Sequence, residues 1–542
     1  ISSWQEYIDN LGNLSQAIVS SLKKKARQTL LFDTMGTELS GAKLLTAAIT
    51  FAKRIKQQPE PAVGVLLPTG AAGVICNIAA LFSGKTLVNL NYTASQEALL
   101  SALEQAGIRT VYTAERFLTK LAAKGMPLET MLSGVQLIKL EEFAKTITPR
   151  EKLLTLFWVH LLPSWLLQKI YTTPVAPEAC AVVLFSSGSE GAPKGVQISH
   201  KNLLANVKQI TDVLNMEDND VVMANLPLFH AFGLTVTQFL PLVQGLPMVC
   251  HADPTDVLGS AKAIATYRAT ILFGTSTFLR LYVRNTKIQP LMLNSLRFVV
   301  AGAEKLHAEV RSGFSQKFNI AIYEGYGATE VAPVASVNLP DKLELESWQT
   351  QLGQRAGSVG MPLPGTSVKI VDPQTFIELP TGEAGMILIG GPQVMVGYLN
   401  NPEKTASAIK EIDGMRWYVT GDKGYIDEDG FIFIVDRYSR FAKIGGEMIS
   451  LSQVETAIKE QINNPEIDVV VINLPDDKKG EKLIALHEAP LDTDNLRQQL
   501  QAAGLNPLAI PGQWCLVAQL PKLGSGKTDF SAAKKLAEEA AR

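Results

Sequence analysis

The sequence predicts an α/β protein in which a large N-terminal domain of helix-covered sheets is followed by a compact α+β tail. Short apolar, β-branched runs alternate with helical patterns to about residue 320, which is typical of a parallel sheet covered by helices. From Ser358 to Val435 short strands are separated by Gly and Pro turns, and mixed patterns return after Arg437. We therefore expect an α/β core at 1–357, a β-rich subdomain of the same N-terminal domain at 358–436, and a C-terminal domain at 437–542.

Individual elements follow from local patterns. Apolar positions recur at helical spacing through residues 1–30, which predicts covering helices there. Runs rich in valine, isoleucine and leucine, bounded by turn residues, predict buried strands. The strand candidates are Ala62–Leu67, Leu87–Leu90, Val182–Phe185, Val221–Asn225, Thr270–Phe273, Phe298–Val300 and Val469–Ile472.

Composition narrows the class of protein. The chain has 542 residues, 46% of them hydrophobic and 19% charged, with a formal net charge of −2. This balance argues against a protein built mainly to bind nucleic acid. The four cysteines lie far apart and the six histidines lack metal-ligand spacing, so we expect neither a disulfide framework nor a metal cluster. A reducing compartment fits this cysteine pattern. No secretory signal is seen at the start of the sequence.

A glycine- and serine-rich loop stands out within Val182–Gly195, directly after a predicted strand. Glycines let the backbone approach a ligand, while backbone N–H groups, hydroxyls and a lysine attract anions. The loop predicts a phosphate site, and the alternative is an ordinary strand-to-helix turn. It is not a Walker A loop, because Pro193 precedes the lysine, and Gly524–Thr528 fails the same pattern. The candidate phosphate-binding residues are Ser186, Ser187, Gly188, Ser189, Gly191 and Lys194.

Together with four further motifs in the same order, this loop resembles the signature of adenylate-forming enzymes, the superfamily of acyl-CoA synthetases, luciferases and adenylation domains. The further motifs are Tyr323–Glu330, Tyr418–Asp422, Asp436–Glu447 and Pro521–Lys527. Stretches such as LFSSGSEGAPKG and RFAKIGGEM most resemble the acyl-carrier-protein synthetase portion of bifunctional acyltransferase/synthetase proteins. The resemblance implies the adenylate-forming fold, and the closer likeness implies an acyltransferase domain upstream in a longer protein. The start at Ile1 rather than methionine suits a piece of a longer chain, and a recombinantly expressed fragment would look the same.

The resemblance also implies a reaction. A fatty acid carboxylate attacks the α-phosphate of ATP, with Mg²⁺ as the second cofactor, and yields an acyl adenylate and pyrophosphate. A phosphopantetheine thiol then takes the acyl group and releases AMP. The expected acceptor is acyl carrier protein. The alternative is CoA, which ends in the same arm, and a different class would be a non-catalytic nucleotide or acyl sensor.

The resemblance assigns nucleotide-binding roles to individual residues of this chain. The resemblance makes Thr329 an α-phosphate ligand and Glu330 the Mg²⁺ ligand, which suits a hard cation that prefers oxygen. Asp422 and Arg437 are expected at the ribose. Glu190 replaces a usual hydroxyl, so we leave it out of the site. The residues expected to line the adenine pocket are Gly302, Ala303, Glu304, Gly325, Tyr326 and Gly327.

The resemblance also assigns roles to residues of the C-terminal tail. Lys527 resembles the adenylation lysine, which bridges the attacking carboxylate and the α-phosphate. Lys443 and Gly446 belong to the opposite face, which closes over the site for the thiol step in the family. The resemblance therefore implies a rotating C-terminal domain, although Ser439 replaces the usual Asp or Lys at the hinge.

The acyl group is expected beside His230, within Pro227–Gly233. His230 either contacts the carboxylate or orders the pocket, and a purely structural role is the alternative. Nearby apolar residues favour a hydrocarbon tail but fit an ordinary core equally well. They are Phe229, Phe232, Leu234, Phe239, Phe273 and Phe278.

Leu153–Leu167 is almost continuously apolar and contains two tryptophans and Pro163. It is shorter than the roughly 20 residues of a spanning helix. The first interpretation is a buried helical hairpin. The second is a patch that touches the membrane surface or covers the mouth of the acyl site. We therefore expect a location on the cytoplasmic side, with association with the inner membrane as the finer hypothesis.

Overall fold

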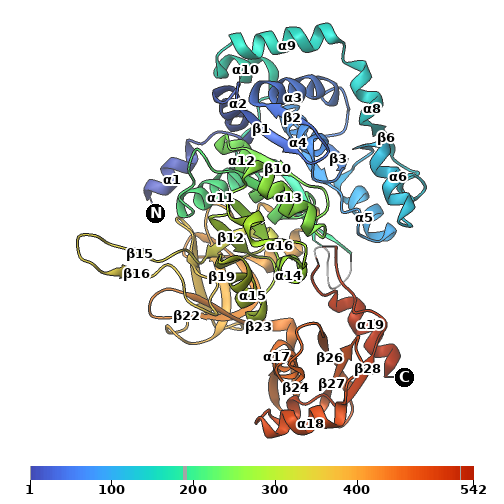
Figure 1. The fold of residues 1–542 in the computed structure, drawn as a ribbon, viewed down its shortest axis with the longest axis vertical. Coiled ribbons are helices and arrows are strands. Elements are labelled where there is room, and N and C mark those ends of the chain that lie inside the picture. Colours follow the sequence, from blue (N-terminus) through green and yellow to red (C-terminus); the bar gives the residue numbers. More distant parts are fainter. Residues whose placement is uncertain (1, 187–191, 525, 542) are drawn as a thin grey trace.

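The computed structural model describes residues 2–186, 192–524 and 526–541. A large body carries two central sheets and a third, antiparallel sheet, and a small α+β tail lies at one end of it (Figure 1). This arrangement of helix-covered sheets and a smaller C-terminal unit confirms the predicted α/β fold class.

The first sheet has seven strands in the order β20-β8-β7-β4-β3-β5-β6. Strands β4, β3, β5, β6 and β7 run parallel, whereas β8 pairs antiparallel with β7 and with β20. The bounds are β3 (Ala62–Leu66), β4 (Thr86–Asn89), β5 (Thr110–Thr113), β6 (Gln136–Lys139), β7 (Cys180–Ser186), β8 (Lys194–Ser199) and β20 (Gly397–Tyr398).

The second sheet has nine strands in the order β17-β14-β13-β12-β11-β9-β10-β1-β2. Its six central strands are parallel and its edges, β2, β14 and β17, are antiparallel. The bounds are β1 (Thr29–Asp33), β2 (Glu38–Ser40), β9 (Val222–Ala224), β10 (Met248–Cys250), β11 (Ile271–Gly274), β12 (Phe298–Ala301), β13 (Ile322–Gly327), β14 (Val334–Val337) and β17 (Met361–Pro362).

Helices cover these sheets and bury the main apolar cluster between them. The two N-terminal helices confirm the pattern seen in residues 1–30. The helices are α1 (Ser2–Asp9), α2 (Leu14–Lys24), α3 (Gly41–Ile55), α4 (Ala71–Phe82), α5 (Gln96–Ala106), α6 (Glu115–Ala123), α7 (Leu128–Met131), α8 (Leu140–Phe143), α9 (Pro149–Leu161), α10 (Ser164–Tyr171), α11 (His200–Val213), α12 (Leu240–Gln244), α13 (Val257–Tyr267), α14 (Ser276–Arg284) and α15 (Ala308–Phe318).

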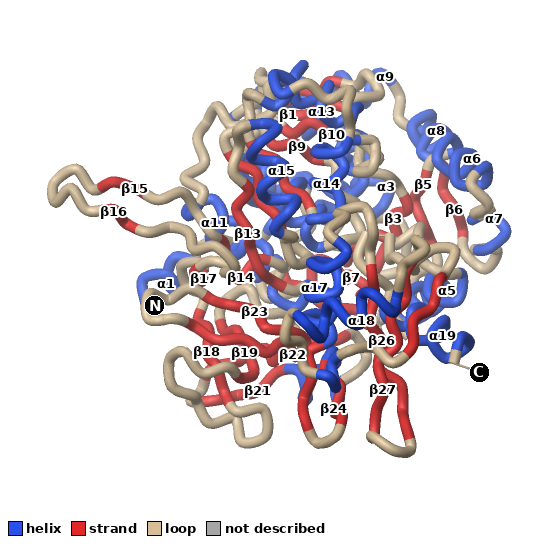
Figure 2. Tube along the Cα trace, turned by 60° about the horizontal axis from the view of Figure 1, so that its bottom comes forward, coloured by secondary structure: helices blue, strands red, loops and turns tan. Residues whose placement is uncertain are grey.

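The third sheet is antiparallel and follows the body sheets in the chain. It contains β18 (Ser367–Val371), β19 (Gly385–Gly390), β21 (Ile409–Ile412), β22 (Met415–Ile426) and β23 (Ile432–Arg437), and helix α16 (Pro402–Ala408) precedes β21. A narrow hairpin of β15 (Lys342–Leu343) and β16 (Thr350–Gln351) projects from the body in both views (Figures 1 and 2).

The tail has its own apolar clusters and is joined to β23 by a 3₁₀ turn at Tyr438–Arg440. Its strands are β24 (Phe441–Ile444), β25 (Glu447–Ser450), β26 (Val469–Asp476), β27 (Gly480–His487) and β28 (Gln513–Leu516). Its helices are α17 (Leu451–Ile462), α18 (Thr493–Ala502) and α19 (Phe530–Ala540). Further 3₁₀ turns lie at Ala144–Thr146, Pro290–Leu293, Thr329–Val331 and Pro507–Ala509, and a π-helix spans Phe232–Phe239.

Two local predictions are wrong. One is the alternative interpretation of the glycine- and serine-rich loop as a strand-to-helix turn, because β7 and β8 pair as an antiparallel hairpin on either side of it. The segment 153–167 does form a helical hairpin, α9 and α10, but its large apolar side chains are exposed rather than buried. Among the described residues, none of the helices is long and apolar enough to span a membrane.

Candidate active site

The predicted phosphate loop lies at the turn of the β7–β8 hairpin. Ser186 and Lys194 stand opposite each other at its base, and the Ser186 hydroxyl donates to the carbonyl of Lys194 at 3.5 Å. Ser187, Gly188, Ser189 and Gly191, like Glu190, lie outside the described residues, so their phosphate contacts stay predictions. The hairpin nevertheless places Lys194 at the mouth of this loop.

Lys194 lies beside the predicted Mg²⁺ ligand. Its Nζ is 5.5 Å from the centre of the Tyr398 ring, and the Tyr398 hydroxyl donates to Glu330 Oε1 at 2.9 Å. Burial and the neighbouring Lys404 lower the pKa of Lys194, while Glu330 raises it in part. Sequence reasoning missed Tyr398, which holds Glu330 from a strand 68 residues away. Nothing in its local sequence signals this contact.

The GYG segment at the end of β13 is shaped by backbone crowding. A Cβ on Gly327 would lie 1.8 Å from the carbonyl oxygen of Pro333, so only glycine fits there. At Gly325 the nearest atom, the carbonyl oxygen of Ser336, would be 3.0 Å away. Between them, the Tyr326 hydroxyl donates to Asp422 Oδ2. Thr329 follows in the next turn, directly before Glu330.

Asp422 lies at the junction of the third sheet and the tail. It stands opposite Arg437 in the β22–β23 register, and Arg437 Nε donates to Asp422 Oδ1 at 3.1 Å. The Asp422 carboxylate raises the pKa of Arg437. Each carboxylate oxygen can accept more than one hydrogen bond, so Asp422 retains acceptor capacity for a vicinal diol.

The loop after β12 turns toward the tail. Ala303 has a positive φ of 72°, and the Glu304 carboxylate accepts a hydrogen bond from the backbone N–H of Thr277 at 2.5 Å. Gly302 packs under Phe232, whose ring would lie 3.3 Å from an added Cβ. Glu304 therefore faces the first turn of α14, and its expected contact with adenine stays a prediction.

The Lys527 loop of the tail contacts the body beside these residues. Thr277 Oγ1 donates to the carbonyl of Gly526 at 3.4 Å, and Gly524 packs against Thr93 of the body. Burial lowers the pKa of Lys527, whereas the carboxylates of Glu304, Asp422 and Glu330 raise it in part. These shared charges show that the structure brings this lysine into the neighbourhood of the predicted nucleotide residues.

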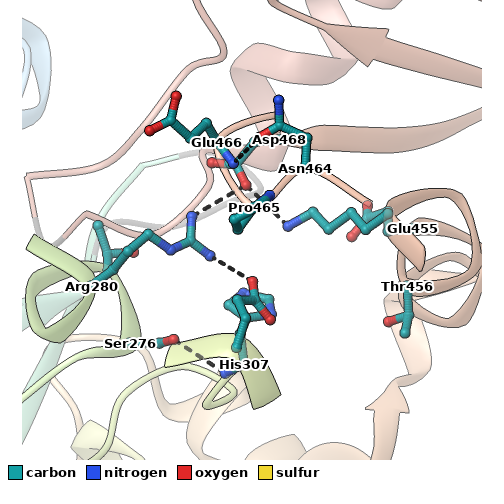
Figure 3. A network of polar contacts seen from close by, with 12 residues as sticks. Ser276, Arg280, His307, Glu455, Thr456, Asn464, Pro465, Glu466 and Asp468 are labelled. Carbon is teal, nitrogen blue, oxygen red and sulfur yellow. Dashed lines mark hydrogen bonds and ion pairs between the residues drawn. The ribbon is translucent and has the colours of Figure 1, made fainter. Parts of the chain in front are cut away.

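A polar network holds the tail in this position (Figure 3). Arg280 of α14 contacts Asp468 of the tail at 3.4 Å and Glu309 of the body at 3.3 Å. Lys459 also pairs with Asp468, at 3.0 Å. Nearby, Arg284 donates to the carbonyl of Pro465 at 2.6 Å. The sequence motifs do not include this network, because its partners are up to 188 residues apart.

The other predicted face of the tail does not reach the pocket here. Lys443, Gly445 and Gly446 are exposed on the β24–β25 hairpin, which lies on the part of the tail away from the body (Figure 1). Gly446 has a positive φ of 87°, a conformation that glycine adopts readily. The thiol-step roles of Lys443 and Gly446 therefore stay predictions.

His230 precedes the π-helix Phe232–Phe239. Such helices are rare and occur often at functional sites. The backbone N–H of Phe232 donates to His230 Nδ1 at 3.3 Å. Burial lowers the pKa of His230 to about 3, and the charge of Lys527 adds to this effect. The imidazole is therefore neutral and lies in the neighbourhood of the Lys527 ammonium.

The six apolar residues flagged beside His230 have different surroundings. Phe232 and Phe273 line a narrow apolar cavity of about 20 Å³, whereas Leu234 and Phe239 are fully buried in the main core. Phe229 packs against Tyr92, and the Phe278 ring would lie 3.6 Å from a Cβ added to the glycine that precedes Lys527. The remaining cavity residues are Ile210, Val213, Leu214, Val236, Val300, Val334, Val337 and Leu363.

The charges of the pocket suit a nucleotide triphosphate with Mg²⁺. Lys194, Lys404, Arg437 and Lys527 act on one another or on the same carboxylates. The second oxygen of Glu330 has no hydrogen bond to a described residue, which leaves it available to a cation. No cluster of three His, Cys, Asp or Glu side chains that could hold a metal occurs in the described part of the chain. Mg²⁺ fits such a site, because it binds through few carboxylates together with phosphates and waters.

Comparisons with known proteins agree with this geometry. Residues 19–399 match the model of the AMP-binding enzyme family. The chain is 30% identical over 521 residues to the long-chain-fatty-acid–CoA ligase of Bacillus subtilis (strain 168), covering 91% of this chain and 89% of that protein. Over 520 residues it is 28% identical to the ligase of the same name from Salmonella typhimurium, covering 92% and 90%.

Solved structures share the fold. ATP-bound MatB from Rhodopseudomonas palustris superposes with a TM-score of 0.78 at 23% identity, covering 98% of this chain and 100% of that one. MenE from Bacillus subtilis in complex with ATP and a magnesium ion gives 0.74 at 23% identity, covering 94% and 98%. The family match covers more than half of the sequence, and the chain therefore belongs to the AMP-binding enzyme family, with ATP and Mg²⁺ as its cofactors.

Proposed function

We propose that this enzyme activates a fatty acid as its acyl adenylate and then transfers the acyl group to a phosphopantetheine thiol. The observation that supports the proposal is the position of Lys527, which contacts the body through Gly526 and Thr277 and shares the charges of Glu330 and Arg437 with Lys194. A cation delivered there can bring a carboxylate and a phosphate together, since both are anions that otherwise repel.

In the first step a carboxylate oxygen attacks the α-phosphorus, and the bond to pyrophosphate breaks. Lys527 would bridge the two reacting anions, and Lys194 would stabilise the leaving phosphates. Mg²⁺ on Glu330 would supply further positive charge. The Asp422–Arg437 pair would hold the ribose, leaving the protein with positioning and charge stabilisation rather than covalent chemistry.

In the second step a thiol attacks the adenylate carbonyl, a C–S bond forms, and AMP leaves. Because the Gly445–Gly446 turn lies away from the pocket, this step requires the tail to turn and present that hairpin. The adenylation arrangement described above would therefore be one of two working positions.

A fatty acid suits the acyl pocket. The cavity beside Phe232 and Phe273 is lined throughout by apolar side chains, which favour a hydrocarbon over an amino acid. Its volume of about 20 Å³ has room for about one water molecule, so the acyl chain would open it further on binding. The relatives from B. subtilis and S. typhimurium are named long-chain-fatty-acid–CoA ligases, which supports the same substrate class.

Two thiol acceptors are in question. The names of these relatives favour CoA over the acyl carrier protein expected from the sequence motifs. The carrier-protein hypothesis is still supported by the likeness of residues 184–195 and 440–448 to carrier-protein synthetases. The expectation of an upstream acyltransferase domain depends on the same likeness. Both acceptors end in the same arm, so the pocket residues fit either.

A single assay distinguishes these outcomes. The enzyme is incubated with radiolabelled palmitate, ATP and Mg²⁺, and either CoA or holo acyl carrier protein at equal thiol concentration. We expect pyrophosphate release and labelled acyl-CoA. Label found only on the carrier protein would show that acyl carrier protein, and not CoA, is the acceptor. Absence of pyrophosphate release with every fatty acid tested would favour a non-catalytic sensor.

A further inference from the structure

The hairpin of α9 and α10 presents apolar side chains to solvent on its outer side. Leu153 is 68% exposed and Trp165 is 63% exposed, values normally seen for charged residues. We call the exposed apolar residues of this hairpin the apolar crest; they are Leu153, Leu154, Phe157, Trp158, Leu161, Trp165 and Ile170. On α9 its members follow helical spacing, so they form one continuous stripe.

The inner side of the hairpin is already fixed to the body. Thr155 and Val159 are buried, and Arg54 makes a bidentate pair with Glu151 at 2.8 and 3.0 Å. Lys23 of α2 donates to the carbonyl of Val159 at 2.8 Å at the end of α9. Because these contacts orient the helix, the crest faces outward as part of the fold and cannot turn inward without breaking them.

Basic side chains surround the crest. Residues 145–171 contain four lysines and arginines but one acid, Glu151, which is neutralised by Arg54. At the end of α9, His160 and the basic run at the end of α2 line an open depression of about 430 Å³. Lys24 and Arg27 of this run flank it. Lys25 of the same run pairs with Asp218 at 3.9 Å, so it is left out. We call Lys24, Arg27, Lys152 and Lys169, all exposed, the basic rim.

We propose that the apolar crest and the basic rim together dock this protein on an anionic phospholipid bilayer. Leucine and phenylalanine side chains would enter the boundary between headgroups and acyl chains, and Trp158 and Trp165 would lie at the interface, where tryptophan is enriched. The rim would bind lipid phosphates, because each basic residue near an anionic surface raises partition roughly five-fold.

A bilayer fits better than a second copy of this chain. In a two-fold symmetric dimer through the crest, the basic rim of one copy would lie near that of the other, and like charges oppose association. Figure 1 shows the crest helices at the end of the molecule opposite the tail, so a docked protein would keep its tail free to turn. The proposal does not depend on which thiol the enzyme uses.

Vesicle flotation with the full chain tests the proposal. We expect binding to vesicles of phosphatidylcholine with phosphatidylglycerol, weaker binding to phosphatidylcholine alone, and a decrease with added salt. The triple variant L153E/F157E/L161E should lose at least about ten-fold in partition, because three charges would have to enter the interface. The variant K24E/R27E should weaken binding to anionic vesicles selectively.

The control is Leu345→Glu, which makes the same kind of change at another exposed position, 70% accessible, near the projecting β15–β16 hairpin. It should bind as the unmodified protein does. Quenching of tryptophan fluorescence by brominated lipid should disappear in W158F/W165F but persist in W348F. Pyrophosphate release with a short, soluble fatty acid should be unchanged in every variant, which shows that each is folded.

Two results would overturn the proposal. One is unchanged partition of the crest variant into anionic vesicles. The other is a dimer of the unmodified protein in solution that the crest variant abolishes, because the crest would then be an interface between copies.

Discussion

At the scale of single residues, Lys527 carries the sharpest expectation. Burial lowers the pKa of its ammonium, and the carboxylates of Glu304, Asp422 and Glu330 raise it in part. We expect Lys527→Ala to slow acyl-adenylate formation by at least about 10²-fold, the size typical of losing one electrostatic stabiliser. Pyrophosphate exchange measures this step, and transfer from a preformed acyl adenylate should be much less affected.

Lys534→Ala, an exposed lysine on α19, is the matched control and should leave both half-reactions unchanged. Equal losses in the two half-reactions of Lys527→Ala would contradict a role confined to adenylation.

His230 gives a prediction about pH. Because burial lowers its pKa to about 3, the imidazole is neutral at and near neutral pH. The pH profile of kcat/KM for adenylation should therefore show no inflection near 6.5 from this residue, and His230→Asn should keep the shape of the profile. An inflection near neutral pH that disappears in His230→Asn would show that the histidine titrates in the working enzyme.

The apolar cavity predicts chain-length selection. Val213 lines it from the half-buried end of α11, where a larger side chain can be accommodated. The cavity measures about 20 Å³, room for about one water molecule, so an acyl chain must widen it on binding. Val213→Phe should oppose this widening and shift the preferred fatty acid toward shorter chains, measured as the ratio of kcat/KM for octanoate and palmitate. The same ratio in Val213→Ala is the control for a general loss of packing, and an unchanged ratio in Val213→Phe would place the acyl chain elsewhere.

At the scale of elements, helix α14 links the tail to the body. Arg280 on this helix contacts Asp468 of the tail while Thr277 at its start holds Glu304 and the Lys527 loop. We expect Arg280→Ala to reduce the docked population and slow adenylation about five-fold, the change produced by losing a modest ion pair. Thiol transfer should be unchanged or faster.

Arg109→Ala, at an exposed position in the first third of the chain, is the comparison and should have no effect on either step. If Arg280→Ala slowed transfer as strongly as adenylation, the network would not be specific to one position of the tail.

Elements also show where local patterns suffice. The apolar runs correctly predict the buried strands β3, β4, β9, β11 and β12, because a short β-branched run between turn residues is typical of a buried strand. The same reasoning fails at α9 and α10, since an apolar helix pattern does not reveal which side meets solvent. The exposed side is decided by contacts such as Arg54–Glu151 and Lys23–Val159.

At the scale of the whole molecule, the position of the tail decides which step the pocket can perform. A variant with Arg280→Cys and Asp468→Cys, joined by a short bifunctional thiol reagent, should lock the arrangement of Figure 3. We expect the linked protein to keep pyrophosphate exchange but to lose thiol transfer at least about ten-fold, because the β24–β25 hairpin could not reach the pocket.

The linked variant is made with the partly exposed Cys180 and Cys515 replaced by serine, whereas Cys76 and Cys250 are buried and stay. Each single cysteine variant in the same background, treated with the same reagent, is the control. Transfer that continues at full rate in the linked protein would show that the tail need not turn.

The sequence by itself determined the α/β class and the family, because the motifs from residue 182 to residue 527 are short, contiguous and ordered. It also pointed to Lys194, Glu330, Asp422 and Lys527, each from residues within its own motif. Only the tertiary structure decided that Tyr398 holds Glu330, that Glu304 binds the start of α14, and that Arg280 ties the tail to the body. These contacts join residues far apart in the chain, and their distances are set by sheet order and helix packing, which no local pattern encodes.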